Sequence, residues 1–149
     1  MKEKILEAFK ALGFVLDELD ALGYGFQYEG NKYLYMYNEN DEGFLNIVLP
    51  VTMDGDEGND MSFYQVMDKI NGALKYIKAY KFHDGLWLSY ERELFGDEDL
   101  EQVLYNMILH LDTSFGFLRR LMGCSDDEDD TAPDVTDMEI STDNDENVA

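Results

Sequence analysis

The chain has 149 residues, of which 33 are Asp or Glu and 11 are Lys or Arg, so its formal net charge is −22. This length suits one domain, and the excess of acids argues against direct binding of nucleic acid or of anionic membranes, because both need a basic protein surface. Basic proteins are the electrostatically favoured partners.

The acidic charge is distributed unevenly along the chain. Residues 125–149 hold eleven acids and no Lys or Arg, whereas residues 1–124 hold the other 22 acids and all 11 bases. The last segment also lacks aromatic residues, so it cannot bury enough apolar surface to offset the entropy of ordering. We therefore expect a folded domain over residues 1–123 and a disordered acidic tail over residues 124–149.

Neither a disulfide framework nor a targeting segment is expected. Cys124 is the only cysteine, which fits a reducing cytoplasm. Acids and lysines interrupt the apolar residues near the N-terminus, and no stretch has the length of a transmembrane helix. The composition thus predicts a cytoplasmic protein.

The first predicted element is a helix over residues 3–22, because apolar residues recur there every three or four positions. Gly13 would bend or interrupt this helix, and Gly23 would end it. Three strands are expected next, where β-forming residues alternate with polar ones. They span residues 24–29, 32–38 and 44–51, with a tight turn at Gly30-Asn31 between the first two.

The second half of the folded region contains two helices and a hairpin. Ser62 and Gln65 form a capping box at the start of a helix whose apolar stripe continues to Ile77. Strands at residues 78–83 and 86–93 are joined by the strong turn signal Asp84-Gly85. Asp97 is expected to cap the last helix, whose apolar stripe runs from Leu100 to Met122. The predicted fold is α+β, in the order α-β-β-β-α-β-β-α, with an antiparallel five-stranded sheet covered by helices.

This element order, together with KINGALKYIKAYKFHDGLWLSYERELF at residues 69–95, resembles the YbjN-like family. The matching features are Ile70-Asn71, Lys75-Tyr76, Ala79-Tyr80, Asp84-Gly85 and Leu86–Glu91. The resemblance implies the fold of type III secretion chaperones, which bind extended segments of secreted proteins and are usually dimers. Members of the family are described as regulators of sensory transduction or as chaperone-like. The family has no established catalytic residues, so the resemblance implies none.

No constellation for catalysis or metal binding is visible. The acidic loop at residues 54–60 departs from an EF-hand loop at three positions, although weak binding of a divalent ion there stays an alternative. His83 and His110 lack further ligands at suitable spacing, and Cys124 has no base partner. We therefore expect no catalytic residue, no metal and no cofactor.

Aromatic residues in the strands provide the candidate binding surface. Side chains alternate between the two faces of a strand, and one set of faces is plainly aliphatic while the other is aromatic and amphipathic. The aromatic face is expected to contact a partner, and the alternative is that a helix covers it. The candidate partner-binding residues are Tyr33, Tyr35, Tyr37, Phe44 and Trp87.

These observations together predict a binding protein with no enzymatic activity. The first hypothesis is a chaperone-like or regulatory module, in homodimeric form, that accepts a protein or peptide on its aromatic face or at an exposed strand edge. The alternative is an acidic regulator or decoy whose tail engages a basic protein. Binding through the tail would fall steeply with salt. An enzyme is the least favoured reading.

Overall fold

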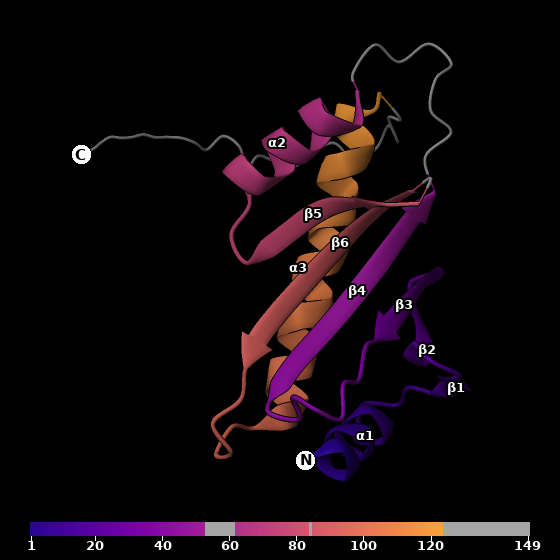
Figure 1. The fold of residues 1–149 in the computed structure, drawn as a ribbon, viewed down its shortest axis with the longest axis vertical. Helices are drawn as coiled ribbons and strands as arrows, with labels where there is room; N and C mark the ends of the chain where they lie inside the picture. The colour runs from indigo at the N-terminus through magenta and orange to yellow at the C-terminus, as the bar shows by residue number, and fades with distance from the viewer. Residues whose placement is uncertain (53–61, 84, 124–149) are drawn as a thin grey trace, which may run out of the picture.

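The computed structural model describes residues 1–52, 62–83 and 85–123. The acidic loop at residues 54–60, the expected tail at residues 124–149 and Cys124 lie outside these residues. In chain order the elements are α1 (Lys2–Ala11), β1 (Asp17–Leu19), β2 (Gly23–Tyr28), β3 (Asn31–Tyr35), β4 (Phe44–Thr52), α2 (Phe63–Ala73), β5 (Ile77–Phe82), β6 (Gly85–Glu93) and α3 (Leu100–Leu121). Figure 1 shows their arrangement.

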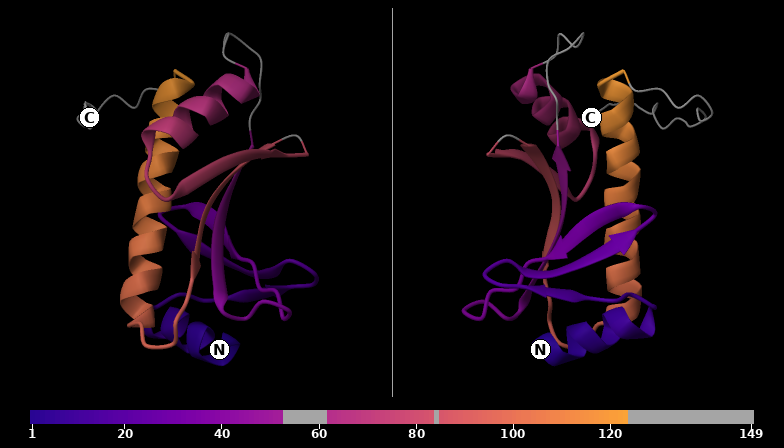
Figure 2. Two further views of the ribbon diagram at one scale, coloured as in Figure 1. Left: turned by 60° about the vertical axis from the view of Figure 1, so that its left-hand side comes forward. Right: turned by 90° about the vertical axis from the view of Figure 1, so that its right-hand side faces the viewer.

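The strands form one antiparallel sheet in the order β1-β2-β3-β4-β6-β5. The predicted α+β class and antiparallel sheet are confirmed, but the described sheet has six strands where five were expected. All three described helices lie on one side of this sheet. α3 runs along that side, with α1 packed against one of its ends and α2 against the other (Figures 1 and 2).

The sixth strand arises because the predicted helix over residues 3–22 is wrong in its second half. α1 ends at Ala11, and Gly13 adopts a left-handed φ of 95° that a helix does not accommodate. Residues 17–19 then pair with β2 as the edge strand β1. Gly23, expected to stop the helix, instead begins β2 with a φ of 117°, where a Cβ would lie 2.2 Å from the carbonyl oxygen of Tyr35.

The core lies between the sheet and the three helices. Its strand residues come from alternate positions, so they share one face. Its helical residues are the apolar stripes predicted from the sequence, with Phe9, Ile70 and Leu111 all fully buried. The core residues on the strands are Phe26, Tyr33, Tyr35, Leu45, Ile47, Leu49, Ile77, Ala79, Leu86 and Leu88.

One predicted turn shifts by one residue, and one predicted helix cap shifts by two. The β2–β3 turn consists of Glu29 and Gly30, both at positive φ, and not of Gly30-Asn31. Asp99, not Asp97, caps α3 through a hydrogen bond from the Gln102 amide. The capping box between Ser62 and Gln65 is confirmed in both directions.

The start of α3 is held by Glu98, one residue before the cap. Its carboxylate accepts hydrogen bonds from the backbone amides of Phe95 and Gly96 at 2.8 and 3.0 Å. It also accepts from Arg92 at 2.9 Å. These donors, the Phe95 amide foremost, lower the pKa of Glu98 because they stabilise its charged form.

Candidate functional site

The structure separates the five candidate residues between the two faces of the sheet. Tyr33 and Tyr35 are 0% and 1% exposed, on the face that the helices cover. Tyr35 lies opposite Ile47 of β4, so both side chains share this face. The prediction of a partner-binding role on an exposed face is therefore wrong for these two tyrosines, because they belong to the core. Burial also raises the pKa of both hydroxyls.

Tyr37 lies on the same covered side, just beyond the end of β3. Its ring packs 6.4 Å from that of Tyr35, and the ammonium group of Lys2 lies 4.8 Å from its centroid. It is only partly buried. The contact with Lys2 of α1 explains the position of Tyr37 better than a role in binding a partner does.

Phe44 and Trp87 lie on the opposite side of the sheet, which no described helix covers and which we call the open face. Phe44 pairs with Glu93 at one end of β4, whereas Trp87 pairs with Pro50 near the other end. The partner-binding role predicted for these two residues stays a prediction. On β4, β5 and β6 the residues of the open face are Phe44, Asn46, Val48, Pro50, Lys78, Tyr80, Phe82, Trp87, Ser89, Glu91 and Glu93.

Trp87 is the centre of an aromatic group on this face. Its ring lies 4.2 Å from that of Phe82 and 6.2 Å from that of Tyr80, two residues of the neighbouring strand. Phe82 is well exposed, and burial followed by the charge of Glu91 raises the pKa of Tyr80. We call Tyr80, Phe82 and Trp87 the Trp87 cluster. Sequence reasoning missed Tyr80 and Phe82, although their parity in the hairpin places them beside Trp87.

The middle of the open face is deeply buried although no described helix lies over it. Val48 and Ser89, which pair across β4 and β6, are each 0% exposed. In Figure 2 the β5–β6 hairpin and the β1–β2 turn both project away from α3. One cross-strand row runs across the middle of this face. Its residues are Asp17, Gly25, Leu34, Val48, Ser89 and Lys78.

Two polar atoms on the open face are buried without a hydrogen-bond partner among the described residues. They are the hydroxyl oxygen of Ser89 and the amide oxygen Oδ1 of Asn46. The nearby cation Lys78 is already engaged, because its Nζ lies 2.9 Å from Oε1 of Glu91. An unpaired buried polar group costs roughly 1–3 kcal/mol. Both atoms are enclosed by the protein, so they are a cost to the packing of this face and not free groups at its surface.

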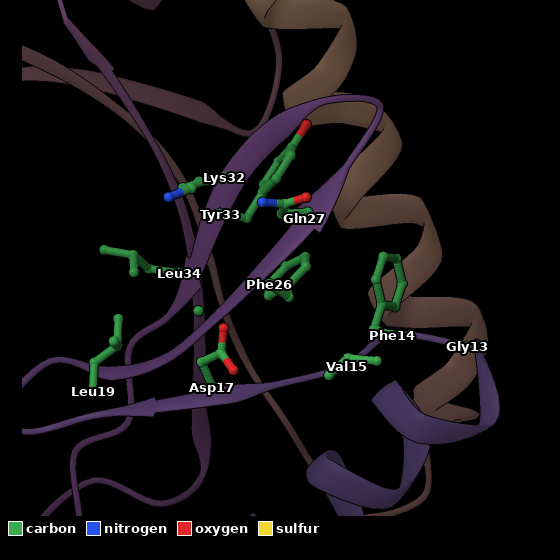
Figure 3. Close-up of a pocket in the computed structure, with 11 residues that line it drawn as sticks. Gly13, Phe14, Val15, Asp17, Leu19, Phe26, Gln27, Lys32, Tyr33 and Leu34 are labelled. Carbon is green, nitrogen blue, oxygen red and sulfur yellow. The ribbon is translucent and has the colours of Figure 1, made fainter.

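A cavity of about 540 Å³ lies at the other end of the sheet, around the edge of β2. Its lining includes Leu19, Gly25 and Leu34 from the open face of the sheet. It also includes Phe14 and Phe26 from the covered side. Figure 3 shows Leu34 on one side of the β2–β3 hairpin and the two phenylalanines on the other. β1 pairs with β2 only at residues 23–25. The cavity therefore begins where the outer edge of β2 loses its neighbouring strand.

The histidines occupy structural positions. His110 donates from Nδ1 to the carbonyl oxygen of Asn106 at 2.8 Å, and its ring packs against Tyr76 and Tyr90. The ring of His83 packs 4.3 Å from that of Phe82. Within the described residues, no three His, Cys, Asp or Glu side chains are placed to hold a metal ion. No helix in the part of the chain that the structure describes is long and apolar enough to cross a membrane.

Comparison with known proteins shows the fold and nothing finer. No family model matches the chain, and no curated protein sequence matches it significantly. A crystal structure of an uncharacterized protein from Methanothermobacter thermautotrophicus is similar, with a TM-score of 0.56 and 10% sequence identity. The match covers 82% of this chain and 99% of that one. The similarity thus extends over most of the α+β domain.

Proposed function

We propose that this chain is a binding protein without enzymatic activity that holds an extended polypeptide segment of a partner on its open face. The observation that carries this proposal is the Trp87 cluster, an aromatic group that includes the exposed Phe82 on a sheet face that no described helix covers. Aromatic residues on such a face are suited to accept the apolar side chains of an extended peptide.

The proposal gives the Trp87 cluster a defined role. Trp87 and Phe82 would anchor an apolar side chain, since aromatic residues supply most of the binding energy in protein interfaces. A chaperone-like role of the YbjN-like or type III secretion kind, in homodimeric form, belongs to the same proposal.

Binding can be measured directly because Trp87 is the only tryptophan of the chain. Fluorescein-labelled peptides with alternating apolar and polar residues, in neutral, basic and acidic versions, would be titrated and followed by anisotropy and by tryptophan emission. We expect saturable binding with a shift of the Trp87 emission. Phe82→Ser should weaken it about tenfold, the effect of losing ~1.4 kcal/mol.

Tyr64→Ser is the matched control, because Tyr64 is an equally bulky aromatic residue that is 69% exposed on α2, away from the open face. Equal loss in both variants would contradict a site on the open face. Binding confined to basic peptides that vanishes with salt and on deletion of residues 125–149 would instead support the acidic regulator.

A further inference from the structure

Asn71 closes an edge of the sheet with its side chain. Among the described strands β5 is the last on one side of the sheet, so its outer main-chain groups have no neighbouring strand there. The side-chain amide of Asn71 nevertheless donates to the carbonyl oxygen of Ala79 at 3.1 Å and accepts from the Ala79 amide at 2.7 Å. The amide thus makes the two hydrogen bonds that one residue of an added strand would make.

Ala79 is the central position of this edge. Main-chain groups in an antiparallel strand point alternately toward the two neighbours. Because the groups of Ala79 point outward to Asn71, those of Ile77 and Lys81 point outward as well. An added strand would need all three positions, and Asn71 occupies the middle one.

The helix that carries Asn71 is fixed beside the edge. Val66 and Ile70 of α2 are both fully buried in the core. Near the other end of α2, the ammonium group of Lys81 lies 5.3 Å from the ring centroid of Phe63. Asn71 therefore reaches Ala79 from a helix that is held at two further points.

The register of β5 is compatible with pairing of this edge with a second β5 strand. IKAYKF contains Ile, Tyr and Phe, which favour strands. An antiparallel pair centred on Ala79 places Ile77 opposite Lys81 and Lys78 opposite Tyr80, so no like charges face each other. Exposed strands of this kind are a common route to edge-to-edge association.

We propose that Asn71 keeps the β5 edge closed to a second copy of this chain. The occupant that Asn71 excludes is β5 of another molecule, added in antiparallel orientation about Ala79. This role is independent of the proposed function, since the open face and the β5 edge are different surfaces. It predicts that loss of the Asn71 amide converts the edge into a self-association site.

The test compares the full-length chain with Asn71→Ala by hydrogen exchange and by sedimentation velocity over a wide concentration range. We expect the Ala79 amide to exchange roughly five- to tenfold faster, the effect of losing one hydrogen bond. The sedimentation coefficient of Asn71→Ala should rise with concentration beyond any rise in the unmodified chain. Asn106→Ala is the matched control, because its amide lies exposed on α3 and bonds to Gln102.

Asn71→Asp gives a second, milder variant in case Asn71→Ala does not fold. The carboxylate can still accept from the Ala79 amide but cannot donate to the Ala79 carbonyl. We expect slow exchange at Ala79 with association intermediate between the unmodified chain and Asn71→Ala. A folded variant that sediments like the unmodified chain at every concentration would overturn the proposal, as would unchanged exchange at Ala79 in Asn71→Ala.

Discussion

The hydroxyl of Tyr33 is an unsatisfied polar group in the core. Its oxygen is buried without a hydrogen-bond partner, although the side chain itself is completely enclosed. Tyr33→Phe removes this group and keeps the ring, which packs 5.4 Å from Phe26. We expect the free energy of unfolding to rise by about 1 kcal/mol, measured by urea titration. Tyr35→Phe is the control, and a loss of stability in Tyr33→Phe would mean that the hydroxyl is satisfied in solution.

Asp112 on α3 makes stability depend on pH. Burial, followed by the charge of Glu29, raises its pKa above the ordinary 3.8. A raised pKa in the folded state means that the contribution of Asp112 to stability is complete below pH 3.8 and is lost as the pH rises through the folded-state value. Asp112→Asn should therefore raise the melting temperature at neutral pH.

That gain should disappear below pH 3.8, where the carboxyl group is neutral in both states. Thermal melts followed by circular dichroism at both pH values check this, with Asp68→Asn on the exposed side of α2 as the control. A gain that persists at low pH would show that the effect is not electrostatic.

At the scale of elements, hydrophobic periodicity predicted the helices well where the apolar stripe packs on the core. It failed beyond Ala11, where the chain leaves the helix and forms β1. The pattern that predicted a helix to residue 22 includes Val15, which is in fact 80% exposed. Periodicity cannot distinguish an apolar stripe that packs on a core from one that does not. It also does not reveal the left-handed φ of Gly13, at which the helical pattern breaks. Capping chemistry was more reliable, because the bonds between Ser62 and Gln65 are local.

The capping box also provides the test at this scale. Ser62→Ala removes the hydrogen bond from the Gln65 amide at 3.2 Å. We expect a loss of about 1 kcal/mol in the free energy of unfolding. Ser62→Asp, which keeps an acceptor at the cap, should retain most of the stability. Equal losses in the two variants in a urea titration would mean that the hydroxyl has a role other than capping.

At the scale of the whole molecule, the alternation of side chains along the strands could not predict which face of the sheet the helices cover. Both faces of β3 carry apolar residues, so the pattern was compatible with either Tyr33 or Leu34 facing the helices. The packing of α3 determines which face is covered, and that packing depends on contacts between residues distant in the sequence. The candidate site was therefore predicted only in part, with Phe44 and Trp87 placed on the open face and Tyr80 and Phe82 missed.

The net charge of −22 should make the whole fold sensitive to salt. Repulsion between like charges destabilises a compact state, and salt screens it because the Debye length falls as ionic strength rises. We expect the melting temperature at neutral pH to increase by roughly 2–4 °C between low and moderate sodium chloride, which corresponds to ~1 kcal/mol for a chain of about this size. Near the sequence pI of about 4.1 the net charge vanishes, so the same salt step should change the melting temperature much less. A decrease with salt at neutral pH would mean that attractive ion pairs, such as Arg92 with Glu98, outweigh the repulsion.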